Sequence, residues 1–74
     1  MEYDIGKIRN FDIVKGYGDI VSNNDVYTFL VKDLDSKDRI KNGDLVSFRK
    51  EKINNINRAF FINKIDKYRK ERKK

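Results

Sequence analysis

The sequence predicts an all-β protein that folds as one small closed barrel of five antiparallel strands. Short segments rich in β-branched and aromatic residues alternate with turns that contain Asn and Gly. A chain of 74 residues is long enough for a single domain only. Because five short strands in an open sheet would leave exposed edges, closure into a barrel is the expected solution.

Each strand is predicted from its composition and from the turn that ends it. The cluster from Ser22 to Asp25 suits a hairpin turn, and Lys41 to Asp44 forms another turn because Asn and Gly tolerate positive φ. The stretch 51–57 is interpreted as a loop. The predicted strands are therefore 5–11, 17–21, 26–31, 45–48 and 58–62.

The end of the chain allows two interpretations. Phe61, Ile65 and Tyr68 are spaced as on one face of a helix, and Asp66 can pair with Lys70 four residues on. The last strand therefore continues either into a short amphipathic helix or into a frayed terminus. In both cases the expected division is a barrel over 1–65 and a basic tail over 66–74.

The composition of the chain excludes several classes of function. The chain has neither Cys nor His, which excludes disulfides and the usual zinc, haem and iron–sulfur ligands. No apolar run approaches a membrane span, and the acidic start differs from a secretion signal. We expect a cytoplasmic protein without metal, cofactor or membrane partner.

The positive charge is concentrated at the C-terminus. Residues 1–63 hold 11 basic and 10 acidic side chains, whereas residues 64–74 hold 7 basic and 2 acidic ones. Such a tail is attracted to polyanions because neutralised phosphates release counterions, although it could also be a solvated terminus that aids solubility. The tail cations expected to act electrostatically are Lys67, Arg69, Lys70, Arg72, Lys73 and Lys74.

Aromatic residues are the second candidate feature. Both faces of the strand 26–31 are apolar, so the pattern alone does not say which face is buried. If Ile20, Val26 and Leu30 face the interior, then three rings lie together outside beside Lys15: Tyr17, Tyr27 and Phe29. Exposed rings beside cations suit single-stranded nucleic acid, which offers bases for stacking and charged phosphates. The alternative is that these rings pack beneath the tail, against Tyr68.

Other chemistries are set aside. The acidic stretch 33–38 lacks the Gly and Glu that a calcium loop requires at its sixth and twelfth positions. No phosphate-binding loop is present, and no Ser has a His to act as its base. A barrel of this size offers no deep cleft for acid–base chemistry, so we expect no enzymatic activity.

Four segments resemble the cold-shock domain family, in which an OB-fold barrel binds single-stranded RNA and DNA. Residues 6–12 (Gly-Lys-Ile-Arg-Asn-Phe-Asp) are similar to Gly-x-Val-Lys-Trp-Phe-Asn. Residues 15–20 (Lys-Gly-Tyr-Gly-Asp-Ile) are similar to Lys-Gly-Phe-Gly-Phe-Ile, and residues 25–30 (Asp-Val-Tyr-Thr-Phe-Leu) to Asp-Val-Phe-Val-His-Phe. Residues 40–48 are similar to the family's Leu-x-x-Gly-x-x-Val-x-Phe strand.

The resemblance implies a nucleic-acid-binding face. Carried over by position, this face consists of Arg9, Phe11, Lys15, Tyr17, Tyr27 and Phe29. Three family aromatics are replaced, by Asn10, Asp19 and Leu30, and Asp19 places a negative charge within the platform. The implied function is non-catalytic binding of single-stranded RNA or DNA with low sequence specificity, as in RNA chaperones. The alternative is a cold-shock-like barrel whose aromatic face docks a protein partner or a second copy of the chain.

Overall fold

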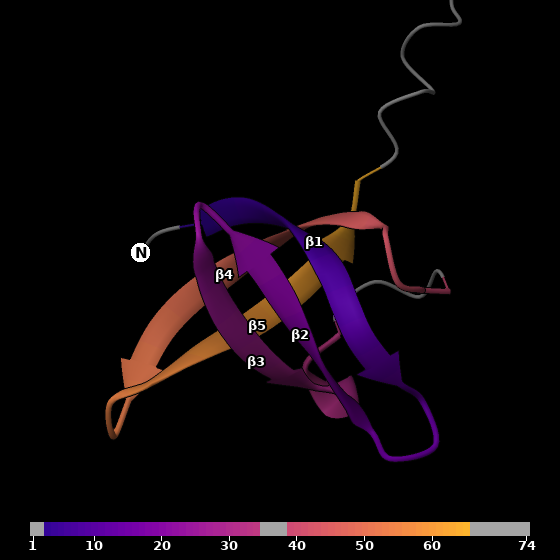
Figure 1. Cartoon of the computed structure of the whole chain (residues 1–74), viewed down its shortest axis with the longest axis horizontal. Helices are drawn as coiled ribbons and strands as arrows, with labels where there is room; N and C mark the ends of the chain where they lie inside the picture. Colours follow the sequence, from indigo (N-terminus) through magenta and orange to yellow (C-terminus); the bar gives the residue numbers. More distant parts are fainter. Residues whose placement is uncertain (1–2, 35–38, 66–74) are drawn as a thin grey trace, which may run out of the picture.

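A single sheet that closes on itself forms the body of the protein (Figure 1). The computed structural model describes residues 3–34 and 39–65. Its strands pair in the order β1-β2-β3-β5-β4, and β4 also pairs with β1. All pairs are antiparallel except β3 with β5, which run parallel as in the OB-fold. The strands are β1 (Tyr3–Asp12), β2 (Tyr17–Ser22), β3 (Asp25–Leu30), β4 (Leu45–Ile53) and β5 (Ile56–Lys64).

The predicted all-β barrel is therefore confirmed, and it includes one short element that is not a strand. A 3-10 helix, Val31–Asp33, follows β3 directly. Residues 66–74, which carry the predicted basic tail, lie outside the described residues. Because β5 continues to Lys64, a helix that begins at Phe61 is wrong for the part of the chain that the structure describes.

Two Asn-Asn pairs make the tight hairpin turns. The φ angles are 50° and 70° at Asn23 and Asn24, and 52° and 67° at Asn54 and Asn55. Two consecutive positive φ values match the twist of the flanking strands, and Asn tolerates this conformation better than most residues. The first turn is the predicted one. The predicted loop over 51–57 is wrong, because Asn54 and Asn55 suffice to reverse the chain and the flanking residues belong to β4 and β5.

Two bulges bend the strands so that the sheet can close. The β1–β2 register shifts between Arg9 and Asp12, where Asn10 has a φ of 53°. The β4–β5 register shifts opposite Phe61, which has a φ of 52°. A bulge inserts an extra residue and increases the local twist. As a result Ala59 and Ile62, three residues apart, are both buried.

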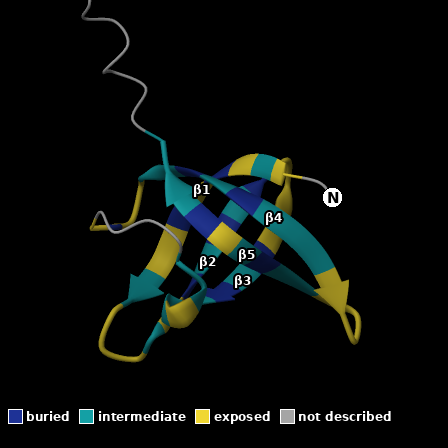
Figure 2. Cartoon of the chain, turned by 180° about the vertical axis from the view of Figure 1, so that it is seen from behind, coloured by how far each residue is buried: buried dark blue, intermediate teal, exposed yellow. Residues whose placement is uncertain are grey.

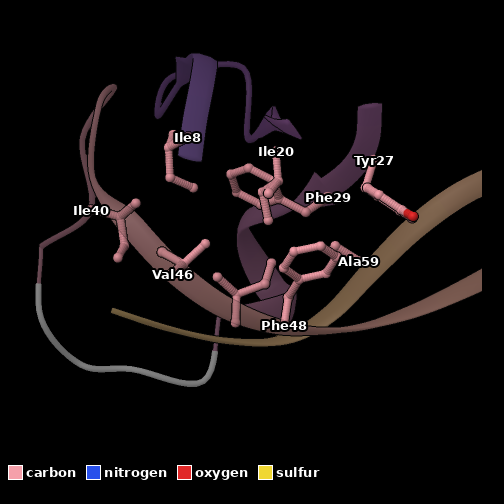
Figure 3. Packing of buried hydrophobic residues seen from close by; sticks show 9 residues of the cluster. Ile8, Ile20, Tyr27, Phe29, Ile40, Val46, Phe48 and Ala59 are labelled. Carbon is pink, nitrogen blue, oxygen red and sulfur yellow. The ribbon is translucent and has the colours of Figure 1, made fainter. Parts of the chain in front are cut away.

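The interior is filled by side chains from every strand (Figure 3). The ring of Phe29 lies in the middle of this cluster, and the rings of Tyr27 and Phe48 are 5.1 Å apart between centroids. Gly18 faces inward beneath Phe29, and a Cβ there would lie 2.9 Å from Cζ of that ring. The buried apolar residues are Ile8, Ile20, Tyr27, Phe29, Ile40, Val46, Phe48, Ala59 and Ile62.

Candidate nucleic-acid interface

The outer surface of β1, β2 and β3 is the wall on which the sequence predicted a binding face. Antiparallel register places Arg9 opposite Asp19, and Asp19 opposite Thr28. The same register places Lys7 beside Val21 on this wall. Side chains alternate between the two faces of a strand, so these residues point away from the core. Figure 2 shows the barrel coloured by burial from the side opposite to Figure 1, with exposed loops and with exposed residues that also interrupt the strands.

Two of the three predicted stacking rings are in the core. Tyr27 is 7% exposed and Phe29 is fully buried, so the prediction that they lie bare on the outer face is wrong. Val26, predicted to face inward, is instead 50% exposed. Because the side-chain period of a strand is two, assigning the wrong face inverts every residue of β3. Tyr27 packs on Phe48 inside the barrel, and the predicted alternative of packing against Tyr68 lies outside the described residues.

Tyr17 is the predicted ring that remains outside. It begins β2, pairs with Asp12 and Leu30, and is 45% exposed. Lys15, two residues earlier, is exposed, and so are Lys7 and Arg9 on β1. The structure therefore places Tyr17 on the same wall as Lys7 and Arg9, with Lys15 exposed in the loop at the end of this wall.

The loop that precedes Tyr17 is well ordered by hydrogen bonds. Oδ1 of Asp12 accepts hydrogen bonds from the backbone N–H groups of Val14 (3.0 Å) and Lys15 (3.1 Å). Gly16 N–H donates to the carbonyl of Asp12 at 2.8 Å, with a φ of 84° that favours glycine. An Asx turn of this kind holds Lys15 and Tyr17 in a defined geometry.

Asp19 stands in the middle of the wall, where it replaces an aromatic residue of the resembled family. Its Oδ2 accepts a hydrogen bond from Nδ2 of Asn10 at 3.4 Å, and Arg9 lies opposite it in register. The neighbouring cation offsets part of the repulsion that a phosphate would meet at this carboxylate. The bulge residue Asn10 thus helps to orient the carboxylate of Asp19 on the wall.

Phe11 belongs to a different part of the surface from Tyr17. Its half-buried ring packs against Phe29 with 5.7 Å between centroids, and its N–H donates to Oδ1 of Asn42 at 2.8 Å. The other side of Phe11 lines a pocket of about 540 Å³ at the end of the barrel. The six predicted barrel residues therefore separate into a wall (Arg9, Lys15 and Tyr17), a pocket residue (Phe11) and two core residues (Tyr27 and Phe29).

The turn 41–44 forms one side of that pocket and is fixed by Asp44. Its carboxylate accepts a hydrogen bond from the backbone N–H of Lys41 (2.9 Å) and from Nζ of Lys41 (3.2 Å). Burial raises the pKa of Asp44, but these bonds and the charges of Lys41 and Lys64 outweigh it and hold the pKa below its ordinary value. The ionised carboxylate therefore stabilises the turn.

Sequence reasoning missed a second group of aromatic side chains on the outer surface. The guanidinium of Arg49 on β4 lies 5.9 Å from the ring centroid of Phe61, and that of Arg58 lies 5.1 Å from the centroid of Phe60. Tyr3 pairs with Arg49 across β1 and β4, and Tyr3 and Ile5 are both exposed. The consecutive rings Phe60 and Phe61 reach the outer surface because of the bulge, which residue alternation alone does not reveal.

No family model matches the sequence, and no curated protein matches it. Within the described residues, the structure contains no helix with the length and apolar character needed to cross a membrane.

Proposed function

We propose that this protein binds single-stranded nucleic acid on the outer wall of β1 and β2, without catalysis and with low sequence specificity. The observation that carries the proposal is that exposed Tyr17 shares one wall of an OB-type barrel with Lys7 and Arg9, with Lys15 in the adjoining loop. A ring that accepts any base, together with cations that meet phosphates, is how such barrels bind unpaired strands.

With one stacking ring on the wall, electrostatic attraction supplies most of the affinity. The whole chain has a formal net charge of +6, concentrated in its last residues. The binding constant should then fall steeply with salt, by a log–log slope of about −0.7 for each phosphate neutralised on a single strand. RNA and DNA strands of the same sequence should bind comparably, because the contacts are to base faces and phosphates.

A fluorescence anisotropy titration tests the proposal. Labelled oligo-dT and oligo-U strands are titrated with the protein at several salt concentrations, with a duplex of equal length as the control. We expect saturable binding that prefers single strands and weakens with salt. Strands that show no anisotropy change at low salt would contradict the proposal.

A truncated chain separates the contributions of the barrel and of residues 66–74. Removing these residues removes six of the chain's 18 basic side chains and should flatten the salt slope, because fewer phosphates are neutralised. The truncated barrel should keep a weaker preference for single strands through Tyr17. A slope unchanged by the truncation would show that these residues do not contact the strand.

A role in protein association is the second candidate, and the exposed apolar group on β1, β4 and β5 favours it. Tyr3 is 57% exposed and Phe61 is 49% exposed, on either side of Arg49. Aromatic residues and Arg are enriched in protein interfaces. Sedimentation of the protein alone over a range of concentrations tests this candidate, which predicts a dimer that Phe61→Ser disrupts.

A further inference from the structure

The pocket at the end of the barrel has an apolar interior. It lies where the loop after β1 meets the turn before β4, and Phe11, Ile13, Leu34 and Ile40 line it. Its volume of about 540 Å³ falls in the range of small-molecule sites, and it is open to solvent. Phe11 contributes an aromatic ring that Phe29 supports from beneath. A flat aromatic ligand therefore finds both space and a ring to pack against.

The rim of the pocket is basic. Arg39 and Lys41 line it, and among the described residues the guanidinium of Arg39 makes no ion pair. Lys41 is held by Asp44 but its side chain remains largely exposed. An apolar interior with a cationic rim is complementary to a nucleotide, whose base is flat and weakly polar and whose phosphate is anionic.

The third polar residue of the rim, Asn42, can read a base edge. Its Oδ1 accepts the N–H of Phe11, which fixes the orientation of the side-chain amide. An amide whose oxygen is engaged retains an NH₂ group with two donors. Among the described residues no hydrogen bond from this group is present. A base carbonyl or ring nitrogen in the pocket would satisfy it.

We propose that this pocket receives the base of one unpaired nucleotide, with its phosphate at Arg39. The proposal rests on the proposed function and makes it more specific. The register pair of Asp12 with Tyr17 places Tyr17 close to the loop that contributes Ile13. One strand can therefore place a base in the pocket and another on Tyr17. The pocket base is the one that Asn42 contacts.

Two matched pairs of variants test the proposal in an anisotropy titration with a short oligo-dT strand. Ile13→Asp is compared with Val14→Asp, which makes the same change at the neighbouring exposed position that does not line the pocket. Arg39→Glu is compared with Lys52→Glu, an exposed cation of β4 outside the pocket. Ile13→Asp and Arg39→Glu should each weaken binding about tenfold more than their partners, because the first removes the site of the base and the second removes the cation that meets its phosphate.

The outcomes distinguish the pocket from the wall. If the unmodified protein does not bind the strand, the proposed function and this proposal both fail. If it binds, and both members of each pair weaken binding equally while Tyr17→Ala is still damaging, the wall is the binding site and the pocket proposal is overturned. Circular dichroism melts of all four variants verify that each is folded, and a variant that melts early is replaced by Ile13→Asn or Arg39→Gln.

A strand with a single abasic position gives a second test. When the missing base is the one that enters the pocket, the strand should bind the unmodified protein about tenfold more weakly, since one base contact is lost. Ile13→Asp should bind intact and abasic strands alike, because its pocket no longer holds the base. An equal loss of affinity in the unmodified protein and in Ile13→Asp would overturn the proposal.

Discussion

The aromatic side chains of this barrel fall into two groups that differ in what surrounds them. Tyr27, Phe29 and Phe48 are buried and contact one another or the glycine beneath them. Tyr17 and Phe61 stand on the outer surface beside cations or solvent. Each inner ring buries apolar surface in a close-packed core, so the inner rings act on stability. Removal of an outer ring should change the stability of the fold little, so the outer rings act on binding.

The largest effect expected from this contrast is on stability. Phe29→Ala removes a fully buried ring at the centre of the core and should lower the free energy of unfolding by about 3–5 kcal/mol. Leu30→Ala, next along β3 but on the outer side and half-buried, is the control and should cost clearly less. Urea denaturation measures both. Equal losses in the two variants would contradict the assignment of the inner face of β3.

Gly18→Ala tests the packing of Phe29 from the neighbouring strand β2, where Gly18 is the register partner of Phe29. The new Cβ would lie 2.9 Å from Cζ of Phe29 and 2.9 Å from the Cα of Phe11, so the core must shift. Overpacking of this kind costs about 1–3 kcal/mol. Phe29→Leu should partly rescue Gly18→Ala in the double variant, because the shorter side chain leaves room. Strictly additive free energies of unfolding would show that Gly18 and Phe29 do not meet.

The outer group predicts a loss of binding without a loss of stability. Tyr17→Ala should weaken binding of oligo-dT about tenfold, as for one lost stack, at every salt concentration. Its free energy of unfolding should change by about 0.5 kcal/mol or less, because the ring is 45% exposed. Tyr3→Ala, an exposed tyrosine at the far end of β1 where this strand pairs with Arg49 of β4, is the control. If both variants bind equally weakly, Tyr17 is not a specific platform.

The smallest expected effect is on the pH dependence of stability, and it comes from the carboxylate of Asp44 in the turn 41–44. The pKa of Asp44 is lower in the folded protein than its ordinary value of 3.8. Its ionised form therefore stabilises the fold above that value, and this contribution is lost as the pH falls toward the lower folded pKa. Asp44→Asn should flatten the acid limb of thermal melts recorded at several pH values. Asp19→Asn on the outer wall is the control, and an equal change in both variants would contradict the role of Asp44.

The sequence predicted the fold better than the site. The conformation of turn residues such as Asn23 and Asn24 can be predicted locally, because Asn tolerates positive φ with little cost. The pair Asn54 and Asn55 carried the same signal, but because the stretch around it is polar, the sequence predicted the two flanking strands too short. For the site, Tyr17 was placed correctly outside, whereas Tyr27 and Phe29 were placed on the wrong side of the sheet.

The sequence by itself determined the number of strands, the positions of three of the turns or loops between them, and the charge that distinguishes the last residues from the barrel. These are local properties of short segments. Only the tertiary structure decided which face of β3 is buried, that the bulge at Phe61 turns aromatic rings outward, and that Phe11 and Ile40 meet at one pocket. Where both faces of a strand are apolar, burial depends on the space that the neighbouring strands leave on each side. On the inner face of β3 this space is provided by Gly18, the partner of Phe29 on β2, which leaves room for the ring.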